Sequence, residues 1–233
     1  MRRRWLKAAG IAMVSLLGSC GQQLAPPAPG PGADLGAYRA KAASGAAIYA
    51  VDPSTSLIAV TVRRAGLMAR LGHDHVVASH TLAGFVAPDA GSADLSFRVD
   101  QMTVDEPQLL RDAGIDKQPS AQAVEGTRTN MLGPVLEAER YPVVTLHAQQ
   151  QAGEQLSVAV TLHGTTRLLT LPATVRVDAA QVTASGTARV KQTDFGNTPF
   201  SVGAGLLSVQ DELEVRYHIV ARRWRPSLGS RGR

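Results

Sequence analysis

The chain has 233 residues, of which 44% are hydrophobic and 4% are aromatic, with 24 Lys and Arg against 19 Asp and Glu. This length suits one globular domain that can bury a sizeable core. Four basic residues precede Cys20 and five follow Ala221, so the body between them has 15 basic and 19 acidic residues. A nucleic-acid-binding domain carries its basic surface on the fold itself, and this body argues against such a partner.

Residues 1–19 are predicted to be a signal peptide. Arg2, Arg3, Arg4 and Lys7 precede an apolar run over residues 8–17, whose length of about ten lies in the range of a signal sequence. A membrane-spanning helix needs about 20 apolar residues. The basic start also resembles a twin-arginine signal, which leaves the export route open.

The only cysteine of the chain, Cys20, follows Leu17-Gly18-Ser19. This order resembles the lipobox of bacterial lipoproteins, in which the cysteine carries a diacylglyceryl group. A plain secretory signal with a chance cysteine is the alternative. Residues 20–36, rich in Pro and Gly, are predicted to be a tether. Gly21 is not acidic, which favours an exported protein anchored in the outer membrane and facing the periplasm.

Apolar and polar residues alternate with a period of two along much of the body, which predicts strands with one buried face. Turn residues such as Asp52-Pro53 separate the stretches. Many such stretches without long helices favour an antiparallel all-β fold. The predicted strands are Ile48–Val51, Leu57–Val62, Leu82–Val86, Ala93–Val99, Val143–His147, Leu156–Leu162, Leu171–Val177, Val182–Val190 and Leu213–Ile219.

Residues 104–141 lack this alternation and are predicted to form a crossover with short helices near Glu106–Ala113 and Asn130–Glu139. Tyr141 ends the second helix, because the residue before a proline avoids the helical region. The folded domain is then residues 37–222. Residues 223–233 are predicted to be a basic disordered tail.

Several short motifs resemble, in order, those of the YceI-like family of polyisoprenoid-binding proteins. Each motif is weak alone, but six in the right order over about 170 residues favour this family strongly. The motifs are Tyr49-Ala50-Val51-Asp52, Gly84-Phe85, the stretch from Asn130 to Thr145 with its Tyr141-Pro142, Leu162-His163-Gly164-Thr165-Thr166-Arg167, Thr193-Asp194-Phe195-Gly196 and Val209-Gln210-Asp211-Glu212-Leu213.

The resemblance implies an extended lipocalin-like closed antiparallel β-barrel of about eight strands, holding a long isoprenoid. A barrel of this size can hold one small ligand, although inward side chains can also simply fill it. The ligand class would be an isoprenoid, a quinone or another apolar or amphiphilic lipid. The inward residues predicted to contact it are Phe97, Val99, Val158, Val160, Val175, Val190, Val215 and Tyr217.

The segment from Leu71 to His80 is unusually rich in histidine. It resembles a branch of the family that carries Gly-His-Asp-His. On a strand, His73 and His75 would point to one face, while His80 would point to the other. They could ligate a divalent metal, with Asp74 orienting a histidine. Alternatively, His73, Asp74 and His75 form a turn at the barrel mouth or contact the headgroup of a ligand.

Evidence for catalysis is thin, since the sequence contains no nucleophile elbow, phosphate-binding loop or His-Glu-x-x-His motif. The neighbours Asp105 and Glu106 would face opposite ways on a strand and are interpreted as solvated. We therefore expect a membrane-tethered envelope binding protein rather than an enzyme. A metal-binding protein or metal-dependent enzyme centred on His73 and His75 is the alternative. A purely structural envelope protein is a third possibility.

Overall fold

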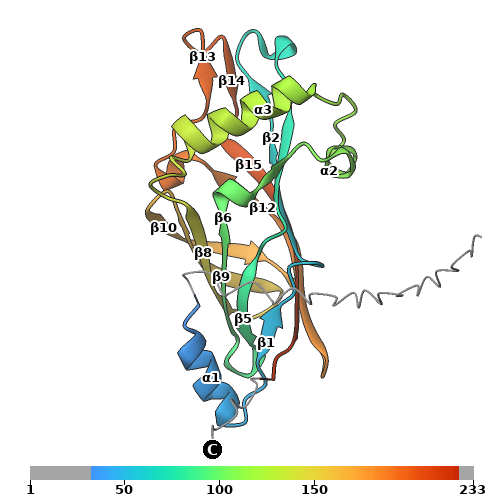
Figure 1. The fold of residues 1–233 in the computed structure, drawn as a ribbon, viewed down its shortest axis with the longest axis vertical. Helices are drawn as coiled ribbons and strands as arrows, with labels where there is room; N and C mark the ends of the chain where they lie inside the picture. Colours follow the sequence, from blue (N-terminus) through green and yellow to red (C-terminus); the bar gives the residue numbers. More distant parts are fainter. Residues whose placement is uncertain (1–32, 226–233) are drawn as a thin grey trace, which may run out of the picture.

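The computed structural model describes residues 33–225. The protein is mostly β, with twelve strands in one large antiparallel sheet and three in a small second sheet. The molecule is elongated, with helix α1 (Leu35–Ala43) at one end and strands β13 (Ser201–Val202) and β14 (Leu207–Val209) at the other (Figure 1). The signal, Cys20 and most of the predicted tether and tail lie outside the described residues.

The large sheet has more strands than the predicted eight, because one predicted strand is divided into two and because β4 and β7 were not predicted. Its members are β1 (Tyr49–Val51), β2 (Leu57–Val62), β4 (His75–Ser79), β5 (Ala83–Ala87), β6 (Ser92–Arg98), β7 (Thr103–Val104), β8 (Val143–Gln150), β9 (Gln155–Leu162), β10 (Thr165–Pro172), β11 (Thr174–Val177), β12 (Gln181–Lys191) and β15 (Glu212–Arg223). The small sheet joins β13 and β14 to β3 (Arg64–Ala65).

Strand β15 holds the large sheet together because it is paired along both edges. One edge pairs with β12 over Gln181–Lys191. The other edge pairs with β2 over its first half and with β1 over its last residues. From β1 the sheet continues through β5, β6, β8 and β9 to β10. All the predicted strands are present in this sheet, and their alternation places one face of each in the interior.

The predicted strand Leu171–Val177 is divided at Ala173 into the end of β10 and β11. The first part pairs with β9, and the second part pairs with β12. Gly186 of β12 lies where the two meet, and a Cβ atom there would lie 2.2 Å from the carbonyl oxygen of Pro172. Only glycine allows so close an approach. The hydroxyl of Tyr217 donates to the same carbonyl, so the change of partner is fixed by specific contacts.

The crossover contains two α-helices, α2 (Pro107–Asp112) and α3 (Ala121–Asn130). The first agrees with the prediction, but the helix predicted over 130–139 was wrong. Ser120 is the N-cap of α3, and its hydroxyl accepts the N–H of Ala123, as is typical of this position. It continues only into one π turn, Met131–Val135, which contains Pro134. A proline inside a helix removes a hydrogen bond and stops it before Tyr141.

Helices α1 and α2 cover apolar patches on the outer face of the sheet. On α1, Tyr38 stacks on Phe85 with ring centroids 5.1 Å apart, and the tilted ring of Trp224 also packs on Phe85 with centroids 4.9 Å apart. On α2, Leu109 and Leu110 pack with Val76 and Ala78 of β4. Helix α1 crosses the predicted boundary between the tether and the domain at residue 36, because Asp34 caps it by accepting the N–H of Ala37.

Four short 3-10 turns complete the described structure: Ala69–Leu71, Pro88–Ala90, Val99–Gln101 and Thr193–Phe195. Within residues 33–225, no helix has the length and apolar character needed to cross a membrane.

Candidate ligand-binding cavity

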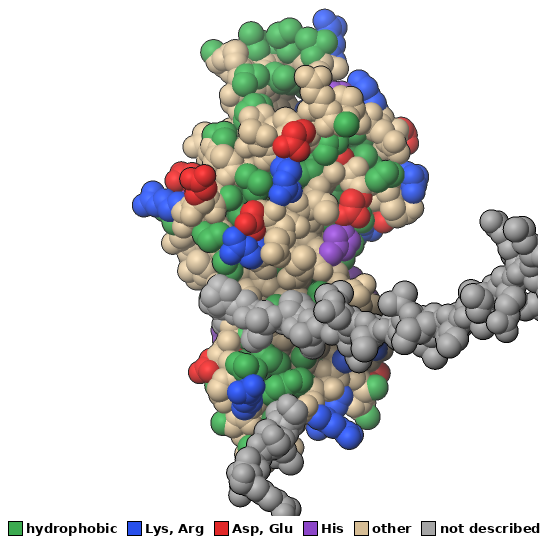
Figure 2. Space-filling view, in the orientation of Figure 1, with side chains coloured by type: hydrophobic (Ala, Val, Ile, Leu, Met, Phe, Trp, Pro, Cys, Tyr) green, Lys and Arg blue, Asp and Glu red, His purple; other side chains and the backbone are tan. Residues whose placement is uncertain are grey.

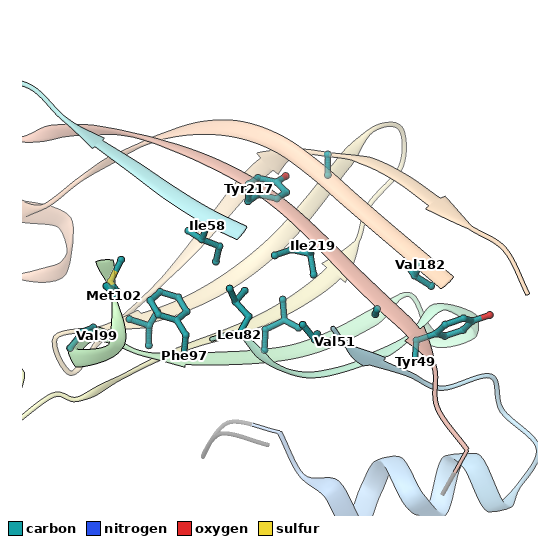
Figure 3. Close-up of a cluster of buried hydrophobic side chains, with 14 of the residues drawn as sticks. Tyr49, Val51, Ile58, Leu82, Phe97, Val99, Met102, Val182, Tyr217 and Ile219 are labelled. Atoms are coloured by element: carbon teal, nitrogen blue, oxygen red, sulfur yellow. The ribbon is translucent and has the colours of Figure 1, made fainter. Parts of the chain in front are cut away.

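The inner face of the large sheet surrounds a cavity of about 600 Å³. Pockets that bind small molecules have about 300–1,000 Å³, so this volume is sufficient for a ligand. The wall is formed mainly by aliphatic side chains of the inward positions, together with Phe97 and Tyr217. Figure 3 shows part of this wall, where Phe97 of β6 and Val99 of the following 3-10 turn lie across from Ile58 of β2 and Ile219 of β15.

The structure brings together every residue that the sequence predicts as a ligand contact. Phe97, Val99, Val158, Val160, Val175, Val190, Val215 and Tyr217 all line the cavity. They come from five strands and one 3-10 turn, and only the alternation of each strand makes them face one space. Their contact with a ligand stays a prediction.

Polar side chains gather at one part of the lining. His73 and His75, at the start of β4, line the cavity beside Thr127 and Asn130 of α3. The rings of His73 and His75 are 6.2 Å apart and meet edge to face. The predicted proximity of the two histidines is therefore present, although His73 precedes the strand. This group gives a mainly apolar cavity a hydrogen-bonding region.

His75 is held by a buried carboxylate. Its Nδ1 lies 2.6 Å from Asp105, and its Nε2 lies 3.3 Å from the hydroxyl of Thr127. Asp105 also accepts the N–H of Val76 at 2.9 Å, and its side chain is fully buried. Asp105 adopts a left-handed backbone conformation with φ of 57°, which Asp tolerates better than most residues. A carboxylate on Nδ1 places the ring proton there and leaves the Nε2 lone pair toward the cavity.

The sequence suggests that Asp74 orients a histidine, but in the structure Asp74 contacts two arginines instead. Its carboxylate lies 3.1 Å from a guanidinium nitrogen of Arg63 and accepts the backbone N–H of Arg64 at 2.9 Å. Burial opposes the charge of Asp74, but these two donors outweigh burial and lower its pKa. Burial lowers the pKa of His73, and the charge of Lys117 adds to this effect. Both effects favour the neutral form of His73.

The interpretation of Asp105 and Glu106 as a solvated pair was wrong for Asp105. Asp105 has a positive φ, and its buried side chain forms a hydrogen bond with the ring of His75. Glu106 is the exposed partner and accepts from His80 at 2.8 Å, so His80 points away from the cavity group. Sequence reasoning missed Asp105 and Thr127, since neither a turn of this kind nor the start of α3 is visible in the hydrophobic pattern.

Within residues 33–225, no group of three or more His, Cys, Asp and Glu side chains is placed to hold a metal ion. Both ring nitrogens of His75 already face hydrogen-bond partners. A metal on this residue would have to displace Thr127 or Asp105. The geometry therefore gives the metal alternative no support of its own.

A family model of the YceI-like domain matches residues 49–221, which span the large sheet from β1 to β15. No curated protein matches the chain. Among solved structures, a polyisoprenoid-binding domain from Saccharophagus degradans, implicated in plant cell wall breakdown, aligns with a TM-score of 0.55 at 14% identity. It covers 77% of this chain and 99% of that domain.

Two further structures align less closely. BcnA of Burkholderia cenocepacia has a TM-score of 0.49 and 18% identity, and covers 73% of this chain and 99% of that one. A YceI protein of Campylobacter jejuni has a TM-score of 0.43 and 13% identity, and covers 62% and 82%. At these identities, the alignment with the Saccharophagus domain shows a shared fold and nothing finer.

Proposed function

This chain belongs to the YceI-like domain family. From that membership we propose that it binds an apolar, isoprenoid-like molecule in the cavity that its large sheet surrounds. The observation that carries the proposal is the cavity, whose lining is mainly apolar. Burying such a ligand against aliphatic side chains yields about 25 cal/mol for each Å² removed from water. The Saccharophagus domain, which binds a polyisoprenoid, has the same fold.

In this proposal the wall is a closed lipocalin-like barrel. Strand β10 pairs with β9, and its continuation β11 pairs with β12. One continuous stretch of chain thus links the part of the sheet that ends in β9 and β10 to the part that ends in β12. Closure at this point protects strand edges beside the ligand.

We assign the polar end of the ligand to His73, His75 and Thr127. With its ring proton on Nδ1, His75 offers Nε2 as an acceptor for a ligand hydroxyl group that takes the place of the Thr127 hydroxyl. Because Asp105 fixes the ring, little side-chain freedom is lost when the headgroup binds. The protein sequesters or carries its ligand by this account, and it needs no bond to be made or broken.

The first test is to identify what the protein carries. Full-length protein, purified gently from a bacterial host, is extracted with organic solvent and measured in parallel by native mass spectrometry. We expect a stoichiometric long-chain isoprenoid, quinone or related lipid. Bare polypeptide across several preparations would count against the proposal.

A cavity-filling variant gives a matched test. Ala188 lines the cavity from β12, while its neighbour Thr187 is exposed on the outer face of the same strand. Ala188→Phe should abolish or greatly reduce lipid retention because the ring occupies the cavity, whereas Thr187→Phe should retain it. Equal retention in both folded variants would show that the ligand lies elsewhere.

We further propose that the protein is exported and held on the envelope by acylation of Cys20, with the outer membrane as its location. This residue lies outside the described part of the chain, and the proposal rests on the lipobox Leu17-Gly18-Ser19-Cys20. Several acyl chains anchor far more firmly than one. Mass spectrometry of the mature N-terminus should show acylated Cys20, and Cys20→Ala should release the protein from the membrane fraction.

A further inference from the structure

Five large hydrophobic side chains are exposed together at the end of the molecule opposite α1. Leu67 is 90% exposed and Leu71 62%, and Met68, Val202 and Leu206 are each more than 40% exposed. They belong to the loops over residues 64–72 and 199–209, which the small sheet joins. We call these five side chains the apolar tip. Figure 2 shows hydrophobic side chains gathered over this end of the molecule.

The apolar tip is built on a defined backbone. The N–H of Met68 donates to the carbonyl of Leu206 at 2.8 Å, and the strands β3 and β14 pair at Ala65 and Ser208. Gly66, with φ of 89°, would place a Cβ atom 2.6 Å from the carbonyl oxygens of Gly205 and Leu206. The two loops therefore touch through backbone. Their large side chains remain exposed on this backbone.

The charge around the apolar tip has one sign. Residues 64–72 and 199–209 contain no Asp or Glu, and their only charged residues are Arg64 and Arg70. Arg64 faces Asp74, while Arg70 is exposed and forms no ion pair with any described residue. Apolar side chains beside arginines are the combination that binds anionic bilayer surfaces.

The apolar tip is continuous with the cavity. Leu71 belongs to both, and Leu207 and Val209 of β14 line the cavity from the same small sheet. His73, two residues after Leu71, begins the polar region described above. A molecule leaving the cavity at this end would meet apolar side chains before it met water.

We propose that the apolar tip inserts into the interface of a lipid bilayer with anionic headgroups, and that the ligand enters and leaves the cavity there. A second copy of the chain is a poorer occupant, since a stable protein interface uses about 20–30 residues a side and about 800 Å² per partner. Five side chains on a protruding end supply much less. Only the passage of the ligand through the apolar tip rests on the proposed function. The contact with the membrane does not, because it is measured separately from ligand content.

The absence of other cysteines allows a site-specific test. In the full chain carrying Cys20→Ser, Leu67→Cys gives a single thiol for the polarity-sensitive fluorophore NBD. The matched control is Leu168→Cys on β10, where the native side chain is 74% exposed but lies outside the apolar tip. Each labelled protein is mixed with phosphatidylcholine vesicles with or without phosphatidylglycerol.

We expect NBD emission at position 67 to rise severalfold with the anionic vesicles and to be quenched by spin-labelled lipid, while position 168 stays unchanged. Arg70→Gln should weaken the vesicle affinity of the 67-labelled protein roughly fivefold, and only when phosphatidylglycerol is present. No rise at position 67, or equal rises at 67 and 168, would overturn the proposal. A rise with protein concentration in lipid-free buffer would assign the apolar tip to a second copy instead. Lipid still extracted from the protein in either case would leave the proposed function standing.

Discussion

The two ends of the molecule place apolar side chains in opposite environments. At one end, Ile48 and Phe85 lie on the outer side of the sheet and are almost completely buried, because Tyr38 of α1 and Trp224 cover them. At the other end, Leu67 and Leu71 are equally apolar and remain exposed. The two ends differ in whether another element packs over these side chains, and not in how apolar the side chains are. An outer apolar patch thus becomes core where a helix is available, and remains a contact surface where none is.

The largest expected effect tests this comparison directly. Phe85→Ala should lower the free energy of unfolding by about 3–5 kcal/mol, because it removes a ring packed between Tyr38 and Trp224. Leu67→Ser should change it by less than about 0.5 kcal/mol, as for an exposed site. Guanidinium unfolding followed by circular dichroism measures both. A comparable loss in the Leu67 variant would mean that the apolar tip is covered in the free protein.

The next effect lies in the polar group near the exposed end. Asp105→Ala leaves His75 and the N–H of Val76 without their buried acceptor, and should cost about 2–3 kcal/mol. Asp105→Asn fits the left-handed backbone and should cost less. NMR of the His75 ring reports its tautomer, which should become mixed in the Ala variant. An unchanged ring spectrum would contradict the role of Asp105 as the orienting group.

A smaller effect tests how α1 is fastened at the covered end. The hydroxyl of Tyr38 donates to Asp94 at 2.7 Å, and burial, together with this carboxylate, raises the pKa of Tyr38. Tyr38→Phe keeps the stacking on Phe85 and should cost about 1–2 kcal/mol. Thermal unfolding checks the value. A loss as large as that of Phe85→Ala would place the stability of this end in the hydrogen bond instead of the rings.

The smallest effect is a pH dependence beside the strands that α1 covers. Ser54 and then Arg222 lower the pKa of Asp52 from 3.8 to about 2. The stabilisation from Asp52 is therefore complete above about pH 4 and is lost as the pH falls toward 2. Since the Arg222 partner is exposed, we expect no more than about 1 kcal/mol. Asp52→Asn should flatten the acid-unfolding curve by this amount, and an unchanged curve would contradict the assignment.

The sequence predicted the sheet well because a period of two is a direct consequence of strand geometry. It placed Phe97, Val158 and Tyr217 on inward faces, and the cavity lies between those faces. It failed where single residues decide the backbone. The positive φ of Asp105 and the capping by Ser120 leave no trace in hydrophobic alternation. The exposure of Leu67 could not be predicted from the sequence either, because it depends on whether another element packs over its loop.

The change of partner at Ala173 has a consequence for how such a cavity can vary in width. The stretch Thr165–Val177 divides its hydrogen bonds between β9 and β12. Since the side-chain period is two, moving the division by two residues keeps every inward side chain inward while one edge of the wall slides along the other. The bore of a strand wall depends on this stagger as well as on strand number. Related chains can therefore adapt to thicker or thinner ligands by a shift in register, with the same strands and the same inward residues.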